Sequence, residues 1–305
     1  MEVPLLDLGP QHVPWRAEYE AAFARVLDSG RFVLGGEVER LEAALAAEAG
    51  VPHALGLSSG TDALLVALMA AGVGPGDEVL VPSFTFFATA GCVHRLGAVP
   101  VFCDVCPVCF NLDAADAARR VTGRTRAVIP VHLFGQAAEM DAINALARER
   151  GLAVIEDAAQ ALGAGYRGHK VGGLGDFAAA SFFPTKNIGG FGDGGVLLAR
   201  EPELFEKARI LRVHGMEPKY YHPVVGGNFR LDALQAALLN VKLPHIAGFN
   251  EQRRGNARGY AEKLGAIEGV AALSAENCAC ERDAPPPPGA RLLLPVAYPH
   301  NAHIW

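Results

Sequence analysis

Lys186 is the residue whose surroundings in this sequence most favour covalent chemistry. It follows a run of small and aromatic residues, 177–183, of the kind found in buried strands, and it precedes a loop with glycines at 189, 190, 192, 194 and 195. Little bulk water reaches a lysine in such a place, so we expect its pKa to fall towards that of an amine that attacks carbonyl carbons. The pattern predicts Schiff-base chemistry; a lysine at the surface tip of a loop is the alternative.

Two carboxylates follow an expected strand further upstream. Residues 152–155 are apolar, and Glu156 and Asp157 come next. An acid at that position is costly to bury unless a cation meets it. Pyridoxal phosphate enzymes use an aspartate to pair with the protonated ring nitrogen of the cofactor, so Asp157 is a candidate for this role. The alternative for Asp157 is a helix cap, and for Glu156 we expect a salt bridge.

A third chemical feature is the segment Ser-Ser-Gly-Thr-Asp at 58–62. It lies between an apolar strand expected at 53–57 and an apolar helix expected at 63–71. Thr61 or Asp62 could cap that helix, or the free backbone N–H groups could receive a phosphate. The strand before the segment favours phosphate binding, because α/β proteins bind ligands at the carboxyl ends of their strands.

The elements that must position these groups alternate regularly along the chain. Strands are expected at 78–81, 99–102, 126–131 and 152–155, and helices at 17–29, 36–49, 84–96, 114–121 and 139–150. This order predicts an α/β fold with a mainly parallel mixed sheet flanked by helices. After the glycine loop, residues 196–198 are expected to pair back as a strand, followed by helices at 202–214, 231–241 and 246–264.

Composition narrows the class of protein. The chain has 305 residues and a net charge of −6, so it lacks the basic surface of a nucleic-acid binder. Its longest apolar run, 63–73, is too short to span a bilayer, and the first fifteen residues lack a signal-peptide pattern. We therefore expect a cytoplasmic protein with no nucleic-acid or membrane partner.

The six cysteines raise the question of a metal site. Cys103, Cys106 and Cys109 form C-x-x-C-x-x-C, which opens one type of iron–sulfur ligand run, but Asp113 stands where the fourth ligand belongs. Cys278 and Cys280 are one residue apart, unlike the usual zinc spacing. We therefore expect no metal site and reduced cysteines.

Five motifs occur in an order and spacing that resemble one family. They are SSGTDAL at 58–64, PSFTFFATA at 82–90, EDAAQALGA at 156–164, SFFPTKNIGGFGDGG at 181–195 and GGNFRLDALQAALLNVKL at 226–243. From about residue 4 to about residue 265 the chain resembles the DegT/DnrJ/EryC1/StrS family of sugar aminotransferases, which depend on pyridoxal phosphate and have the aspartate aminotransferase fold. The resemblance implies a fold-type I transferase with a large domain at 1–243 and the start of a small C-terminal domain at 244–305, which relatives continue further.

The resemblance also assigns roles to matching residues. Lys186 would bind the cofactor as a Schiff base and move the proton, and Asp157 would pair with the ring nitrogen. The other cofactor contacts would come from Gly60, Thr61 and Ser181 at the phosphate, Phe86 on the ring, Gln160 at the ring or its hydroxyl, and Asn228 of the partner subunit at the phosphate. The contacts with the sugar nucleotide would come from Gly30, Phe32 and Arg230.

The implied activity is transfer of an amino group from glutamate to a nucleotide-linked keto-hexose, by a homodimer with shared active sites. The stretch 214–222 resembles family members that act at carbon 3 of the sugar. A catalytically impaired cofactor-binding or regulatory protein and a fold-type I lyase acting on amino acids are the alternatives. Family dehydratases carry histidine at the lysine position, so Lys186 argues against dehydration.

Overall fold

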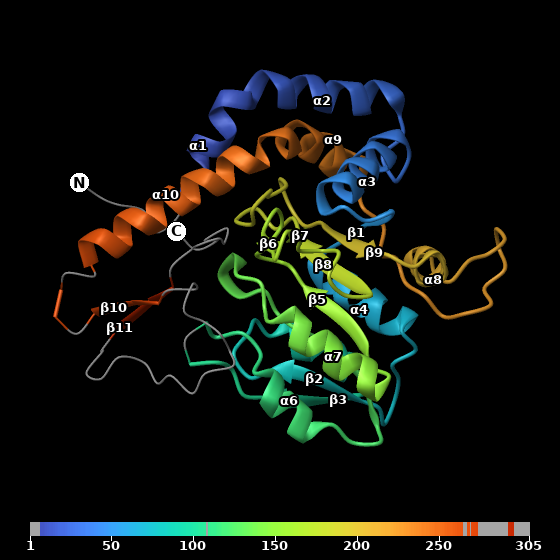
Figure 1. Cartoon of the computed structure of the whole chain (residues 1–305). Coiled ribbons are helices and arrows are strands. Elements are labelled where there is room, and N and C mark those ends of the chain that lie inside the picture. The colour runs from blue at the N-terminus through green and yellow to red at the C-terminus, as the bar shows by residue number, and fades with distance from the viewer. Residues whose placement is uncertain (1–6, 108, 265–266, 269, 274–291, 296–305) are drawn as a thin grey trace.

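A seven-stranded sheet forms the centre of the protein (Figure 1). The computed structural model describes residues 7–107, 109–264, 267–268, 270–273 and 292–295. The strands of the sheet are β1 (His53–Leu57), β2 (Glu78–Pro82), β3 (Val99–Cys103), β4 (Thr125–Val128), β5 (Ala153–Asp157), β8 (Phe177–Ser181) and β9 (Gly195–Ala199). Their order in the sheet is β1-β9-β8-β5-β4-β2-β3.

The strand directions confirm a mainly parallel mixed sheet. Strands β3, β2, β4, β5 and β8 run parallel to one another, so their carboxyl ends meet at one edge, whereas β9 runs antiparallel to both β8 and β1. Asp157, the last residue of β5, pairs with Ala179 of β8, which continues to Ser181. The last residues of these two central strands therefore reach the edge where α/β proteins bind ligands.

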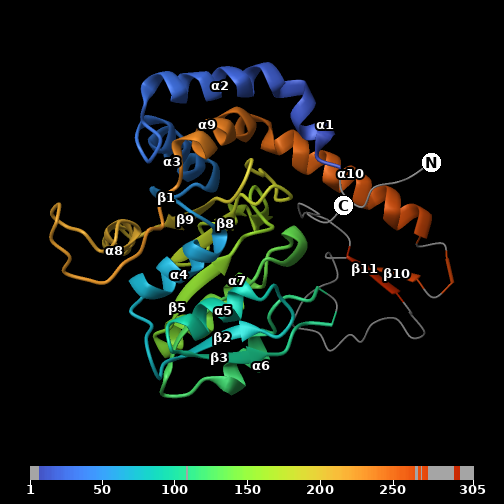
Figure 2. The same ribbon diagram turned by 180° about the vertical axis from the view of Figure 1, so that it is seen from behind.

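Helices cover both faces of the sheet (Figures 1 and 2). One face packs against α4 (Gly60–Ala70), α5 (Ala88–Arg95) and α8 (Pro202–Arg212). The other packs against α6 (Ala114–Arg120) beside β3 and α7 (Met140–Arg150) beside β5, and against α3 (Gly36–Ala49) and α9 (Ala233–Lys242) beside β8 and β9. Because both faces are covered, the strands read as nearly continuous apolar runs.

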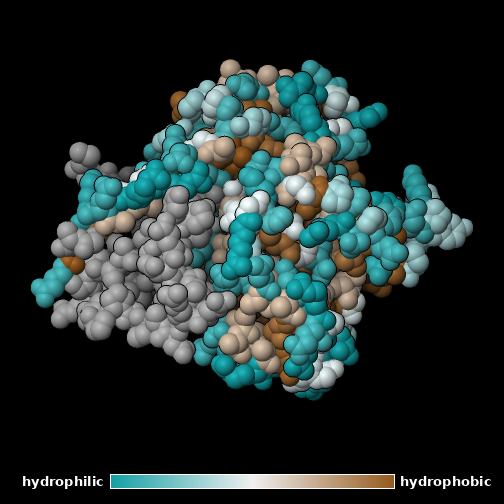
Figure 3. All heavy atoms as spheres, in the orientation of Figure 1, coloured by the Kyte–Doolittle hydropathy of each residue, from teal (hydrophilic) through white to brown (hydrophobic). Residues whose placement is uncertain are grey.

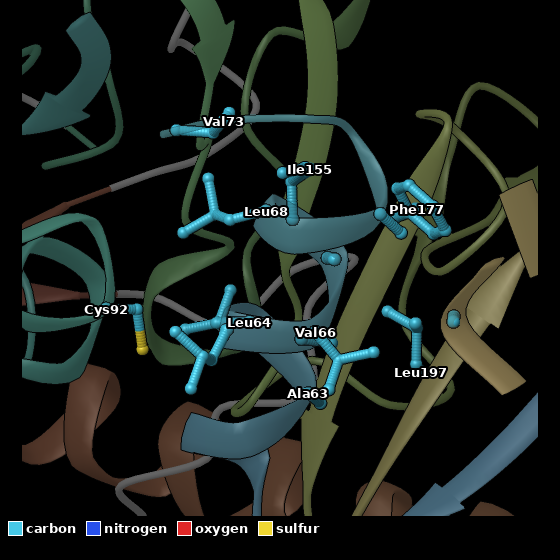
Figure 4. Packing of buried hydrophobic residues seen from close by; sticks show 14 of the residues in the cluster. Ala63, Leu64, Val66, Leu68, Val73, Cys92, Ile155, Phe177 and Leu197 are labelled. Atoms are coloured by element: carbon cyan, nitrogen blue, oxygen red, sulfur yellow. The ribbon is translucent and has the colours of Figure 1, made fainter. Parts of the chain in front are cut away.

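Helix α4 lies at the centre of the largest cluster of buried side chains (Figure 4). Leu64 and Leu68 are almost fully buried, and Cys92, Ile155 and Leu197 from three other elements pack around the helix. Each fully buried leucine contributes about 1.5–3 kcal/mol relative to an exposed one. This packing fixes the N-terminus of α4 against the carboxyl ends of the strands.

The remaining elements lie at the periphery. They are α1 (Gly9–His12), α2 (Arg16–Ser29), α10 (Ile246–Leu264) and the short strands β6 (Gly165–Tyr166), β7 (His169–Lys170), β10 (Val270–Leu273) and β11 (Leu292–Pro295). Helix α2 packs on α9. The segment between α8 and α9 projects from the body of the molecule, as Figure 1 and the space-filling view of Figure 3 show.

Several expected boundaries were wrong. The helix expected at 63–71 begins three residues earlier, at Gly60, because Ser59 and not Thr61 or Asp62 is its cap. The helix expected at 84–96 begins at Ala88, and the phenylalanines before it are exposed. The strand expected at 126–131 ends at Val128, after which the Ile129 N–H still bonds to the Leu80 carbonyl at 2.8 Å.

The domain boundary expected after residue 243 falls between α9 and α10, and with the incomplete small domain it stays a prediction. Among the residues that the structure describes, no group of three or more His, Cys, Asp or Glu side chains could hold a metal ion; Cys278 and Cys280 lie outside them. In this same part of the chain, no helix is long and apolar enough to cross a membrane.

Candidate active site

A cavity of about 460 Å³ opens at the carboxyl edge of the central strands. Its volume lies in the range of small-molecule sites. Seven of the residues singled out in the sequence line it: Gly60, Thr61, Phe86, Asp157, Gln160, Ser181 and Lys186. The structure thus brings together residues that are up to 126 positions apart in the chain, from Gly60 to Lys186.

Lys186 reaches the cavity from the turn that follows β8. The Lys186 N–H donates to the Phe183 carbonyl at 2.8 Å, and Phe183 itself leaves the strand and lines the cavity. Burial lowers the pKa of Lys186 below its ordinary 10.5, while the nearby Asp157 carboxylate acts in the opposite direction. The pKa shift expected from the sequence therefore has the expected sign and cause.

Helix α9 holds the glycine loop that follows Lys186. Gln235 Oε1 accepts a hydrogen bond from the Phe191 N–H at 2.9 Å, and Lys242 Nζ donates to the Gly189 carbonyl at 2.6 Å. A Cβ atom on Gly190 would lie 2.7 Å from Gln235 Oε1, so the loop passes close to this side chain and a larger residue there would displace it. Sequence reasoning missed Gln235 and Lys242, because both read as ordinary positions of an amphipathic helix.

Asp157 ends β5 with its carboxyl group buried. Its Oδ2 accepts a hydrogen bond from Thr89 Oγ1 at 2.8 Å, and its Oδ1 accepts one from the Ala159 N–H at 3.2 Å. Burial raises the pKa of Asp157 above its ordinary 3.8, and the two hydrogen bonds and Lys186 oppose that rise. Asp157 therefore lines the cavity, and its two hydrogen bonds favour the ionised carboxylate that could pair with a cation there.

The N-terminus of α4 forms another wall. Ser59 Oγ accepts a hydrogen bond from the Asp62 N–H at 3.0 Å. The N–H groups of Gly60 and Thr61 also lie in the first turn, where a helix provides no internal acceptor, so they can bind a ligand. A Cβ atom on Gly60 would lie 2.8 Å from Ser181 Cβ. The absence of that atom lets the helix approach β8 and leaves a concave, electropositive end that suits a phosphate.

Gln160 and Phe86 complete the lining. Gln160 Oε1 accepts a hydrogen bond from the Phe134 N–H at 2.8 Å, which fixes the orientation of the amide. Phe86 is 74% exposed at the edge of the cavity. An exposed aromatic ring beside a cavity offers a flat apolar surface on which another ring can stack.

Four of the predicted residues do not line this cavity. Asn228 is exposed on the projecting segment and bridges to Val213 in extended pairing. Gly30 ends α2 in a left-handed conformation, Phe32 is 47% exposed, and Arg230 pairs with Leu57 just before the first turn of α4. Within one chain, the three expected substrate residues and one expected cofactor residue, Asn228, therefore lie outside the cavity lining.

Glu156 points to the opposite face of β5, where its partner is His132. Its Oε2 lies 2.9 Å from His132 Nε2 and accepts from the Gly172 N–H at 3.0 Å, and its Oε1 accepts from two further backbone N–H groups of the same loop. Because His132 Nδ1 accepts from the Ala138 N–H at 3.1 Å, the ring proton lies on Nε2. This buried network fixes the 132–138 segment, which holds Gln160.

We expect Glu156→Gln to destabilise the protein by about 3 kcal/mol, because the new amide NH₂ would face backbone and histidine donors that then lose their acceptor. Urea unfolding would measure the change, with Glu149→Gln at an exposed position as the control. An unchanged unfolding midpoint would show that the network does not stabilise the fold.

These features together define a class of protein. An amine with a lowered pKa, a buried carboxylate and a helix N-terminus surround one cavity at the carboxyl edge of a mainly parallel sheet. Pyridoxal phosphate fits such a site, since its aldehyde, ring nitrogen and phosphate need these three groups. Lys186 and Asp157 would hold its reactive end and its ring, and the first turn of α4 its phosphate.

Comparison with known proteins gives the family. The profile of the DegT/DnrJ/EryC1/StrS aminotransferase family matches residues 15–282, and the chain belongs to this family. This membership confirms the resemblance found in the sequence, the aminotransferase class and pyridoxal phosphate as the cofactor. The fold-type I architecture is confirmed by solved aminotransferase structures.

Three similar proteins illustrate the match. A dTDP-3-amino-3,4,6-trideoxy-alpha-D-glucose transaminase of Streptomyces venezuelae is 47% identical over 268 residues, which cover 88% of this chain and 71% of the relative. A "Pleiotropic regulatory protein" of Geobacillus stearothermophilus is 53% identical over 264 residues, 87% of this chain and 71% of the relative. The crystal structure of S. venezuelae DesV with a ketimine intermediate superposes with a TM-score of 0.85 at 47% identity, and covers 87% of this chain and 71% of DesV.

Proposed function

We propose that this protein is a nucleotide-sugar aminotransferase that moves an amino group from glutamate to a keto group at carbon 3 of a nucleotide-linked hexose. One observation carries the proposal: Lys186 and Asp157 share one cavity in a chain that is 47% identical to a transaminase named for a 3-amino sugar. The product would serve deoxyamino-sugar biosynthesis.

The chemistry divides between the cofactor and the chain. Bound pyridoxal phosphate supplies an electron sink for the carbon that loses a proton. The Lys186 amine, when not bound to the cofactor, would remove the α-proton of the amino donor in the first half of the reaction, and in the second half it would deliver a proton to the acceptor carbon that receives the amino group. Asp157 accepts the hydrogen bond of the protonated ring nitrogen, and its negative charge keeps that nitrogen protonated.

Other lining residues bind and orient the cofactor in this proposal. The backbone N–H groups of Gly60 and Thr61 and the hydroxyl of Ser181 bind the phosphate, because they line the same end of the cavity. Phe86 stacks on the ring. Gln160 orients the ring or its hydroxyl, since its amide is already fixed by the Phe134 N–H.

We further propose a homodimer with shared active sites. Asn228 lies outside the cavity of its own chain on a projecting segment whose Tyr220, Tyr221 and Val225 are 78%, 69% and 88% exposed. Apolar exposure on this scale is common at interfaces. Asn228 of the partner subunit would reach the phosphate, and Gly30, Phe32 and Arg230 would contact the sugar nucleotide. Light scattering after size exclusion tests the dimer, and a monomer would contradict it.

A regulatory protein that binds the cofactor without turnover is the second candidate, because the 53% identical relative is named a regulatory protein. Spectroscopy separates the two. In the proposed function, added L-glutamate converts the cofactor of the purified protein to its amine form, and a keto-sugar nucleotide converts it back with an amino sugar detected by mass spectrometry. A yellow protein that glutamate leaves unchanged would contradict the aminotransferase and favour the regulatory protein.

The cytoplasmic location expected from the sequence belongs to this proposal as well. Cell fractionation with an antibody against the protein would test it. Recovery of the protein outside the cytoplasmic fraction would contradict the location without affecting the proposed reaction.

A further inference from the structure

Two threonines connect the cavity to the carboxylate of Asp157. Thr89 lies in the first turn of α5, 68 residues before Asp157, and its Oγ1 is 2.8 Å from Asp157 Oδ2. Thr85 Oγ1 is 2.9 Å from Thr89 Oγ1. Thr89 is fully buried, whereas Thr85 is half-buried and lines the cavity. The three groups therefore form a chain of hydrogen bonds that starts at the cavity and ends on the acid.

The direction of this chain depends on the proton of Asp157. Each threonine hydroxyl has one proton to donate. When Asp157 is ionised, Thr89 donates to Oδ2, and Thr85 must donate to Thr89. When Asp157 is protonated on Oδ2, the order reverses. The hydrogen bond from the Ala159 N–H to Oδ1 cannot reverse its direction, because a backbone N–H only donates. This bond therefore favours the ionised form of Asp157.

The Thr89 hydroxyl bonds to two side chains outside its own helix, Asp157 and Thr85. A threonine in the first turn of a helix commonly bonds to its own backbone, but here the side chain crosses to β5. A hydrogen bond to an ionised group is about twice as strong as one between neutral groups. In a buried site such a bond both orients the carboxylate and opposes its protonation.

We propose that Thr89 is a positioning residue that holds Asp157 ionised and turned towards the cavity, and that Thr85 fixes the direction of the Thr89 proton. The inference rests on the proposed function in one respect: Asp157 is taken to face the ring nitrogen of the cofactor. Neither threonine needs to touch the reacting atoms. Their effect passes through Asp157 alone.

Two cofactor probes test this role without measuring turnover. Pyridoxal phosphate has the ring nitrogen, and 1-deaza-pyridoxal phosphate has a carbon in its place. Equilibrium dialysis gives the dissociation constant of each probe. Thr89→Val is expected to reduce the preference of the protein for pyridoxal phosphate over the deaza analogue by about tenfold. This is the change expected when one hydrogen bond to a charged group is lost. Thr89→Ser keeps the hydroxyl and is expected to retain the preference.

Controls separate positioning from general damage. Thr125→Val changes another buried threonine, one that does not line the cavity, and is expected to leave the preference unchanged. If Thr89→Val does not fold, Thr85→Val tests the same chain of hydrogen bonds from a half-buried position. It is expected to reduce the preference for pyridoxal phosphate by about threefold. Equal weakening of both probes by Thr89→Val, or an unchanged preference, would overturn the inference. A wild-type protein without preference between the probes would instead overturn the pairing of Asp157 with the ring.

Discussion

Lys186→Ala is expected to abolish covalent attachment of pyridoxal phosphate and to lower the turnover of glutamate by at least about a thousandfold. Two effects combine, since the variant loses both the amine that attaches the cofactor and the group that moves the α-proton, and a positioned acid–base group alone contributes about 10²–10⁴-fold. The fold should survive, because the lysine is half-buried and an alanine removes the cost of placing a charge there.

Borohydride reduction followed by peptide mapping checks this prediction directly. In the wild-type protein the reduced pyridoxyl group is expected on the peptide that contains Lys186. Lys170→Ala is the matched control, because Lys170 is exposed and pairs with Glu48 away from the cavity. A label on another peptide, or turnover that survives in Lys186→Ala, would refute the assignment.

The pH dependence of cofactor binding follows from the same amine. Only the uncharged form of Lys186 attacks the aldehyde. Since burial lowers its pKa, the rate at which apo-protein captures pyridoxal phosphate should rise with pH, with a midpoint below the ordinary lysine value of 10.5. Stopped-flow absorbance across pH measures this midpoint.

Much of the site could be predicted from the sequence because its parts follow regular elements. An apolar run that ends in Glu156 and Asp157 indicates a strand that delivers acids to one edge of a sheet. The apolar run at 177–183 likewise indicates a strand that delivers Lys186 to the same edge. The alternation of strand residues also places Glu156 and Asp157 on opposite faces of the sheet. Glu156 bonds to His132 on one face, and Asp157 lines the cavity on the other.

The supporting contacts could not be predicted, because they join segments that are far apart in the chain. Thr89 bonds to a carboxylate 68 residues later, and Lys242 bonds to a carbonyl 53 residues earlier. Neither position differs in pattern from an ordinary helix residue. The start of the helix expected at 84–96 was wrong for a different reason: its first residues include three phenylalanines, but all three are exposed, and Phe86 lines the cavity.

The largest effect at constant side-chain size is expected for Asp157→Asn, which should lower turnover by about a hundredfold to a thousandfold while Lys186 still binds the cofactor. The amide cannot supply the negative charge that keeps the ring nitrogen protonated. Asp141→Asn, an exposed aspartate on α7, is the control and should leave turnover unchanged. Near-normal turnover in Asp157→Asn would contradict the proposed pairing with the ring.

The same substitution should make the apo-protein more stable. Burial gives Asp157 a higher pKa in the folded protein than the ordinary 3.8 expected in the unfolded chain. Such a carboxyl opposes folding above the folded pKa, and the effect disappears as pH falls below the unfolded pKa. Asp157→Asn should therefore unfold at a higher urea concentration than wild type at neutral pH, and at a nearly equal concentration in acid.

The same variant should also differ in cofactor capture. Because the Asp157 charge raises the pKa of Lys186, the variant should capture pyridoxal phosphate at lower pH than wild type. A variant that is less stable at neutral pH, with an unshifted capture midpoint, would show that Asp157 serves the fold and not the cofactor.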